Sequence, residues 1–279
     1  MAPGPSILVD AHCHFERQEF AGRRAALLEE CALEGIQALV MPGTVRAEWP
    51  LLEALAAEHD ALYYAPGLHP WWADEHQEHD LEALDQWLQQ RREGRQGQSR
   101  LLAVGECGLD RLKGDLARQQ PWFEAQVSLA KKYQLPLLIH SVRTHDSVLS
   151  VLKRAHYAGP ALLHGFSGNY QQASQLIDHG LYLGVTGTIT HERASKTRDA
   201  LSRVPIESLV LETDAPDMPL AGMARGQNSP LALTRILASL CQLRPEAPAT
   251  IRQQLLGNVQ TLYGRDFAEK PAVNPGDCE

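Results

Sequence analysis

The chain has 279 residues, with 34 acidic and 26 basic side chains and a formal net charge of -8. Proteins usually bind nucleic acid through basic patches, so an acidic chain has to hold any phosphate-bearing substrate with metal ions or a local cluster of cations. Hydrophobic residues make up 44% and charged residues 22%, which is ordinary for a globular protein with a large core.

No apolar stretch approaches the roughly 20 residues that a membrane helix needs, and no long apolar region follows the first six residues. We therefore expect neither a membrane span nor a secretory signal. The five cysteines are odd in number and form no C-x-x-C pair, which argues against a disulfide framework and favours a cytoplasmic location. Nothing in the sequence points to a protein partner, and we expect a monomer.

Short apolar runs alternate with segments of helical spacing along the chain. The runs, each typical of a buried parallel strand, cover residues 7–13, 36–42, 62–68, 101–107, 135–140, 161–166, 181–187 and 209–214. The helical segments cover residues 23–35, 49–59, 81–92, 122–133, 147–156, 170–180, 193–203, 229–243 and 248–257.

Eight strands that alternate with helices predict an α/β protein of the (β/α)8 TIM barrel type. A doubly wound open sheet is the alternative that the pattern leaves open. We expect a single barrel domain over residues 1–265, a polar loop at 93–100 and a flexible C-terminal tail at 266–279.

Five of the eight apolar runs carry an ionisable side chain at or near the C-terminal end, where active sites of barrels lie. These side chains are His12, His14, Glu106, His140, His164 and Asp214. Residues two apart on a strand point to the same face, so the first two imidazoles can bind one cation together. Each histidine alone could be a core or capping residue, but burying all six groups without a cation would be costly.

Four imidazoles and two carboxylates are more ligands than one tetrahedral ion needs. They suit two divalent ions that share a bridging carboxylate, either Glu106 or Asp214. Zinc is the metal that we expect in the isolated protein, and manganese, iron or magnesium are alternatives, although magnesium prefers oxygen ligands.

Several residues near this set have two interpretations each. Asp10 and Glu212 lie two residues before His12 and Asp214, and each is either a hydrogen-bonding partner behind a metal ligand or an ordinary strand-end group. Cys13 and Cys107 should point away from the site as packed thiols. His69 ends the third run, and we expect it to contact the substrate.

Basic side chains cluster in the loops after these runs. Arg can donate two parallel hydrogen bonds to a phosphate, which makes Arg143, Arg193 and Arg225 candidate substrate ligands. Charged loops of this kind are nevertheless often merely solvated. Arg111, Lys113, Lys196 and Arg198 lie in the same loops, and His145, Asp146 and His191 are either surface residues or substrate contacts. We expect the remaining histidines to be solvated, such as His59, His76, His79, His156 and His179.

Short motifs over nearly the whole chain carry a resemblance to a known family. They are DAHCHF (10–15), GLHP (67–70), VGECGLD (104–110), LPLLIHS (135–141), HGFSG (164–168), GVTGTIT (184–190), LETDAP (211–216) and RGQNSP (225–230). From about residue 7 to 264 the chain resembles the TatD family of metal-dependent deoxyribonucleases, among the amidohydrolase-like barrels. Its YjjV-type branch is most similar, because of ASKTRD (194–199) and ETDAPDMP (212–219).

The resemblance implies a barrel with one ion held by His12, His14, Glu106 and Asp214, and a second held by Glu106, His140 and His164. Two positions depart from the family pattern. Val142 stands where the family commonly has Arg, with Arg143 next to it, and Gly165 stands where Cys is frequent. No Lys lies in 101–110, which disfavours relatives that bridge their metals with a carboxylated lysine.

These observations suggest a metal-dependent hydrolase that cleaves phosphodiester bonds at DNA ends or in small nucleotides, as a deoxyribonuclease of the 3′–5′ exonuclease type. Asp214 and Glu106 would be the catalytic carboxylates, with Asp214 as proton acceptor for a metal-activated water. Two alternatives stay open. One is an ester or amide hydrolase such as a D-aminoacyl-tRNA deacylase, and the other is a metal-binding scaffold without catalysis.

Overall fold

The computed structural model describes residues 7–93 and 99–268. The strands of this part of the chain are all parallel and lie in two sheets, of order β1-β2-β3 and β4-β5-β6-β7-β8. Their bounds are β1 Leu8–Asp10, β2 Ile36–Pro42, β3 Leu62–Ala65, β4 Val104–Asp110, β5 Leu137–Val142, β6 Ala161–Leu163, β7 Leu181–Val185 and β8 Leu209–Leu211.

Backbone hydrogen bonds outside the ladders join the two sheets into a barrel. The amides of Tyr64 and Leu102 donate to Arg100 and Tyr64 at 2.9 Å each, which connects β3 to the residues before β4. At the other seam the amide of Ala11 donates to Leu211 at 3.0 Å. The predicted (β/α)8 barrel is therefore confirmed, and the open-sheet alternative is wrong.

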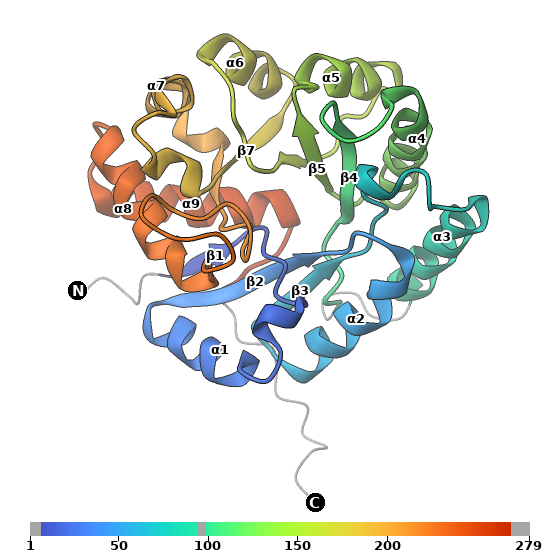
Figure 1. The fold of residues 1–279 in the computed structure, drawn as a ribbon, viewed down its shortest axis with the longest axis horizontal. Coiled ribbons are helices and arrows are strands. Elements are labelled where there is room, and N and C mark those ends of the chain that lie inside the picture. Colours follow the sequence, from blue (N-terminus) through green and yellow to red (C-terminus); the bar gives the residue numbers. More distant parts are fainter. Residues whose placement is uncertain (1–6, 94–98, 269–279) are drawn as a thin grey trace, which may run out of the picture.

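Helices surround the strands in a ring (Figure 1). They are α1 Arg24–Leu33, α2 Trp49–Glu58, α3 Glu78–Glu93, α4 Leu116–Tyr133, α5 His145–Arg154, α6 Tyr170–Asp178, α7 Ser195–Arg203, α8 Leu233–Leu243 and α9 Pro248–Tyr263. Short 3-10 helices lie in the connections: η1 Gln18–Phe20, η2 Arg46–Glu48, η3 Pro70–Trp72, η4 Gly187–Thr190, η5 Ile206–Ser208 and η6 Pro230–Ala232. None of the described helices combines the length and the apolar character needed to span a bilayer.

Neighbouring residues on each strand pack into different layers, because strand side chains alternate between two faces. Ile139 and Leu163 belong to the large layer between the strands and the helices. Leu138 and Leu162 belong to a smaller inner layer, which is filled out by Tyr263 at the end of α9 and by Phe267. The inner layer thus fills the barrel with side chains, and the site has to lie at its rim.

The structure moves several predicted boundaries. β1 and β8 end before His12 and Asp214, and β4 begins three residues later than the predicted run, so Glu106 lies inside its strand. α4 begins at Leu116, where the side chain of Asp115 accepts a hydrogen bond from the amide of Ala117 at 2.9 Å. Residues 94–98 of the predicted polar loop and 269–279 of the predicted tail lie outside the described residues.

Candidate metal centre

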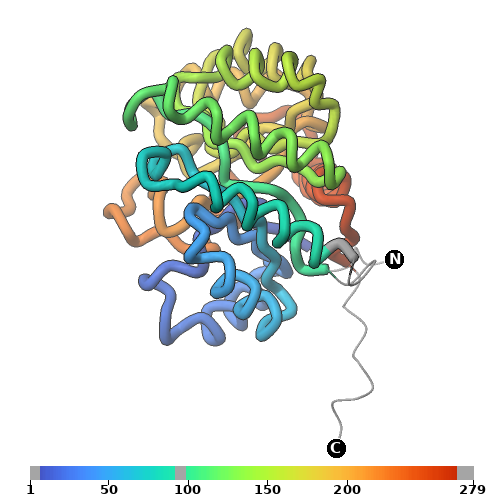
Figure 2. Tube along the Cα trace, turned by 90° about the vertical axis from the view of Figure 1, so that its right-hand side faces the viewer, coloured from blue at the N-terminus to red at the C-terminus, as the bar shows by residue number. Residues whose placement is uncertain are grey.

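Six side chains predicted from the sequence meet at the C-terminal rim of the barrel. His12 and His14 follow β1, Glu106 lies in β4, His140 in β5, His164 directly after β6, and Asp214 after β8. All six are at most 8% exposed. The connection from β8 to η6 (orange in Figure 2) stands out on this side of the barrel. The strands thus deliver donors that are far apart in sequence to one place.

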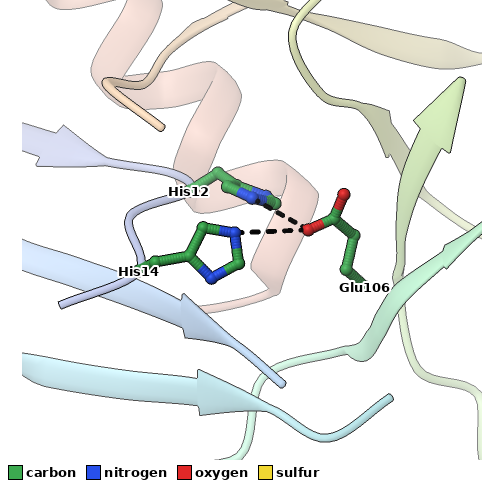
Figure 3. Close-up of side chains that lie close together, drawn as sticks. All are labelled: His12, His14 and Glu106. Carbon is green, nitrogen blue, oxygen red and sulfur yellow. Dashed lines mark ion pairs between the residues drawn. The ribbon is translucent and has the colours of Figure 1, made fainter. Parts of the chain in front are cut away.

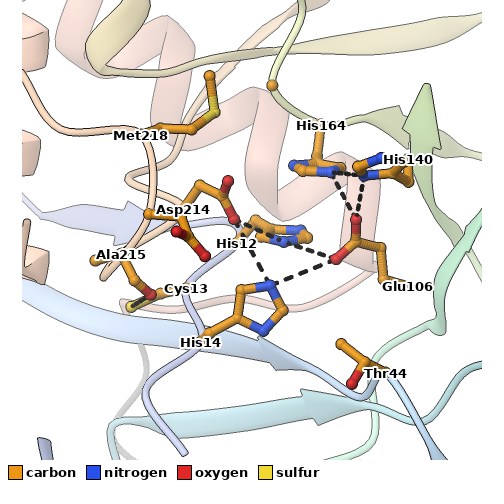
Figure 4. A network of polar contacts seen from close by, with 12 residues as sticks. His12, Cys13, His14, Thr44, Glu106, His140, His164, Asp214, Ala215 and Met218 are labelled. Atoms are coloured by element: carbon orange, nitrogen blue, oxygen red, sulfur yellow. Dashed lines mark hydrogen bonds and ion pairs between the residues drawn. The ribbon is translucent and has the colours of Figure 1, made fainter. Parts of the chain in front are cut away.

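Glu106 divides the donors into two groups. Its Oε2 faces Nε2 of His12 at 3.3 Å and Nε2 of His14 at 3.5 Å (Figure 3). Its Oε1 faces Nδ1 of His140 and Nε2 of His164, both at 2.7 Å. Asp214 belongs to the first group, because its Oδ1 lies 3.3 Å from His12 and 3.7 Å from His14 (Figure 4). A carboxylate with one oxygen toward each group has the geometry of a bridge between two ions.

The protein alone leaves ligand atoms of this cluster unsatisfied. Among the described residues, neither ring nitrogen of the fully buried His12 has a hydrogen-bond partner, and His12 stacks on His164 at 4.0 Å between ring centroids. Burial opposes protonation, but Glu106 and Asp214 raise the pKa of His12 well above its usual range. Burial also raises the pKa of a carboxyl group, yet the surrounding imidazoles of His164, His69 and His12 hold the pKa of Glu106 well below its usual range. Divalent cations would neutralise these buried carboxylates and bind the imidazole nitrogens, so the donor set suits metal ions.

A second carboxylate stands behind one imidazole of each group. Glu16 Oε1 lies 3.2 Å from Nδ1 of His14, and Asp110 Oδ2 lies 3.1 Å from Nε2 of His140. In each case the nitrogen that points away from Glu106 donates to the carboxylate, so the nitrogen that points to the site is the one that would give its lone pair to an ion. Neither residue was predicted from the sequence. Their signal was spacing: Asp110 is four residues from Glu106 on one strand face, and Glu16 is two residues from His14.

His69 contacts the cluster, and with Glu106 and His140 it forms one of the groups of the described residues that could hold a metal ion. Its Nδ1 accepts a hydrogen bond from the amide of Trp71 at 3.1 Å, so the neutral ring carries its proton on Nε2. That nitrogen lies 3.1 Å from Glu106 Oε1 and donates to it. Burial lowers the pKa of His69 to about 4. Both ring nitrogens of His69 thus have partners within the protein, and its contact with the substrate stays a prediction.

Asp10 connects the two strands that flank the barrel seam. Its carboxylate accepts hydrogen bonds from the amide of Thr213 at 2.9 Å, the hydroxyl of Thr213 at 2.6 Å and the amide of His12 at 3.3 Å. These bonds go to backbone and hydroxyl groups. Asp10 thus holds the segments that carry His12 and Asp214 next to each other.

Glu212 lies fully buried beside the same segments. It accepts a hydrogen bond from the amide of Gly165, directly after His164. Burial raises the pKa of Glu212 to about 8. A Cβ on Gly184 in β7 would lie 2.2 Å from the carboxylate of Glu212, so only a glycine at this position leaves room for that side chain. Glu212 therefore fixes the backbone that carries His164.

The candidate phosphate ligands Arg143, Arg193 and Arg225 are exposed and follow β5, η4 and β8. The structure places them in loops outside the buried cluster, and their role as substrate ligands stays a prediction. Arg193 precedes α7 rather than beginning it.

Other histidines differ from the expectation. His76 is 7% exposed, and its Nε2 lies 3.0 Å from the carbonyl oxygen of His69, so the expectation of a solvated side chain is wrong. His145 is buried as the first residue of α5, with Nδ1 2.8 Å from the hydroxyl of Ser141. Cys13 and Cys107 are fully buried thiols, as expected.

A (β/α)8 barrel that gathers four imidazoles and two carboxylates at the ends of its strands defines a metal-dependent hydrolase. Comparison with known proteins agrees. The profile of the family described as TatD related DNase matches residues 9–264, and the chain belongs to this TatD family.

Two relatives from Escherichia coli (strain K12) show similarity over most of the chain. The chain is 42% identical over 257 residues to a protein named uncharacterized metal-dependent hydrolase YjjV. The matched region covers 91% of this chain and 97% of that protein. The chain is 30% identical over 247 residues to one named 3′-5′ ssDNA/RNA exonuclease TatD, covering 85% of this chain and 92% of that one. The crystal structure of the first, described as a TatD homolog, superimposes with a TM-score of 0.87 over 92% of this chain and 98% of its own.

Proposed function

We propose that this metal-dependent hydrolase cleaves phosphodiester bonds at the 3′ end of single-stranded nucleic acid, with two divalent ions in the centre around Glu106. The observation that supports this most is the division of donors by Glu106, whose Oε1 and Oε2 face separate groups at 2.7 Å and 3.3–3.5 Å. Sites with two ions about 4 Å apart recur in enzymes that cleave phosphate esters. The relative named as a 3′-5′ ssDNA/RNA exonuclease supports the polarity and the substrate.

The ligand assignment follows the two groups. His12, His14 and Asp214 would hold one ion, His140 and His164 the other, and Glu106 both. Zinc or manganese suits these imidazole-rich groups better than magnesium. When bound, such ions lower the pKa of water and neutralise charge on a phosphate.

The chain's own residues would supply the rest of the reaction. Of the two carboxylates among the donors, Asp214 is the more exposed, at 8% against 1% for Glu106, so it is the one that would accept a proton from a molecule at the rim. His69 donates to Glu106 and keeps that carboxylate oriented. Arg143, on the exposed loop after β5, would bind an oxygen of the substrate phosphate.

The test measures hydrolysis of bis(p-nitrophenyl) phosphate and of a single-stranded oligonucleotide labelled at its 5′ end. Metal-stripped protein is compared with protein reloaded with Zn²⁺, Mn²⁺ or Mg²⁺. His12→Ala/His14→Ala removes two ligands, and His79→Ala is the matched control, because the side chain of His79 is 63% exposed. We expect reloading to restore cleavage in the wild type and in the control but not in the double variant, with a ladder that shortens from the 3′ end.

Tight metal binding without cleavage of either substrate would refute the proposal. An ester such as a D-aminoacyl-tRNA would then be the next substrate to test, because an acidic chain does not favour long nucleic acid. Metal binding without hydrolysis of any of these substrates would favour the non-catalytic scaffold.

A further inference from the structure

A half-exposed tryptophan lies beside the metal centre. Trp71, in η3 after β3, is 49% exposed. Its ring centroid lies 5.2 Å from that of His69 and 6.0 Å from that of His140, and both imidazoles contact Glu106. The indole is thus separated from the bridging carboxylate by the width of a single imidazole.

The indole is anchored at one edge. Its Nε1 donates to Asp110 Oδ2 at 2.6 Å, and its backbone amide donates to His69 at 3.1 Å. An aromatic ring that is fixed by a hydrogen bond to a buried carboxylate loses little conformational entropy when a ligand packs on it. The anchored edge faces the protein, and the exposed part of the ring is available to a molecule that enters the site.

The surface next to Trp71 is apolar as well as aromatic. Of the five large hydrophobic side chains that are exposed among the described residues, two belong to this corner: Trp71, and Leu112 at 60%. The amide of Leu112 donates to the same Asp110 at 2.7 Å. Single exposed hydrophobic residues need no explanation, but two held by one carboxylate beside a buried polar site indicate a binding surface.

The same corner is positively charged although the chain is acidic. The ammonium of Lys113 lies 4.7 Å from the centroid of the Trp71 ring. Arg111 donates from Nε to the carbonyl oxygen of Arg143 at 3.1 Å, which places these two exposed residues side by side. A flat aromatic surface flanked by cations is the combination by which proteins bind single strands: bases stack on the ring, and phosphates contact the cations.

We propose that Trp71 is the stacking platform for the base of the terminal nucleotide, and that Lys113, Arg111 and Arg143 bind phosphates of the same single strand. This inference rests on the proposed phosphodiesterase function. The ligand of Trp71 would be a single strand, because the base of a paired end is already stacked within the duplex, whereas an unpaired terminal base is free to lie on the indole.

The experiment compares two 5′-fluorescein oligonucleotides that differ only at the last residue, which is a normal nucleotide or an abasic sugar. The readout is the ratio of kcat/KM for the two ends, together with the ratio of their dissociation constants from anisotropy on metal-free protein. Trp71→Ala removes the ring and its N–H, Trp71→Phe keeps a ring, and Asp110→Asn keeps the whole indole while changing its anchor.

We expect the wild type to prefer the base-bearing end by about tenfold, and Trp71→Ala to abolish this preference in both ratios. Trp71→Phe and Asp110→Asn lower cleavage of both ends by the same factor and retain most of the preference. An unchanged preference in Trp71→Ala would overturn the platform. If the wild type binds the base-bearing end more tightly through Trp71 but cleaves neither end, the proposed hydrolysis fails and the platform stands.

Discussion

Replacing Asp110 with Asn should weaken one of the two proposed ions and not the other. In the wild type, Oδ2 of Asp110 accepts from Trp71 at 2.6 Å and from His140 at 3.1 Å, while Oδ1 accepts from the amide of Leu112 at 2.7 Å. An amide has only one acceptor oxygen, and its NH₂ group can only donate. In either orientation at least one of the three N–H groups therefore faces another donor.

The metal affinity should fall because a neutral amide, in whichever orientation, orients His140 less firmly than the carboxylate does. Removing such a hydrogen bond behind a metal ligand typically costs 10–100-fold in affinity, which is roughly 1.4–2.7 kcal/mol. Glu16→Gln should have the same effect on the other ion, through His14, to which Glu16 lies at 3.2 Å. Asp146→Asn is the matched control, because Asp146 is an exposed acidic residue in the first turn of α5.

Calorimetric titration of metal-free protein with Mn²⁺ or Zn²⁺, and metal content per chain after dialysis, measure the two sites. We expect two ions in the wild type and in the Asp146→Asn control. Each of Asp110→Asn and Glu16→Gln should retain one ion at a metal concentration between the two dissociation constants, and the double variant should retain none. Equal weakening of both ions by either single variant would refute the division of the donors by Glu106.

Three further predictions concern stability. Chelation should lower the free energy of unfolding by about 2.7 kcal/mol for each ion held at 100 times its dissociation constant, and in His12→Ala/His14→Ala only the loss due to the second ion should remain, as measured by thermal unfolding. Gly165→Ala should cost about 1 kcal/mol in urea unfolding, since Gly165 has a φ of 58° and an added Cβ would lie 3.4 Å from Met218 Sδ; an unchanged midpoint would contradict this. Glu53 accepts from Arg91 at 2.6 Å through each oxygen, and these hydrogen bonds lower the pKa of Glu53 against a smaller opposing effect of burial. A lowered carboxyl pKa stabilises the fold above the pKa of the unfolded state and loses this effect as the pH falls through the folded value, so Glu53→Gln should cost about 1 kcal/mol at neutral pH and progressively less as the pH falls below the usual carboxyl pKa.

The barrel and the six donors were predictable because both are local features of the sequence. Short apolar runs with His140, His164 or Asp214 at or near the end combine a buried strand with a polar side chain that such burial does not tolerate without a partner. The convergence of these ends follows from the fold class alone, since parallel strands of a barrel place their C-terminal ends on one rim.

The strand boundaries were less predictable because burial continues where the ladder stops. Ala11 and Cys13 are fully buried although β1 ends at Asp10, so apolar character overestimates that strand. The run that begins at Leu101 pairs first with Tyr64, across the seam to β3, and joins β5 only from Val104. Hydropathy reports burial and does not identify which neighbour a strand pairs with.

The layer behind the ligands was missed for a different reason. Glu16, Asp110 and Trp71 contact other side chains of the site: Glu16 contacts His14, and Asp110 contacts both Trp71 of η3 and His140 of β5. The sequence around each residue does not indicate such a contact. The spacing of Asp110 from Glu106 places both on one face of β4, but only the structure shows that His140 lies between them.

The seam between β1 and β8 carries both the closure of the barrel and part of the metal centre. These two strands share no ladder, and the amides of Ala11, Asp214 and His14 donate instead to Leu211, His12 and Ala215 at 2.9–3.0 Å. Two of these amides belong to proposed ligands, so separating the strands would also separate His12 from Asp214. An ion bound by His12, His14 and Asp214 would add a bond across the seam where the ladder is missing. Closing the barrel and binding the first ion therefore depend on the same few backbone hydrogen bonds, which is why the fold and the site cannot be altered independently at this seam.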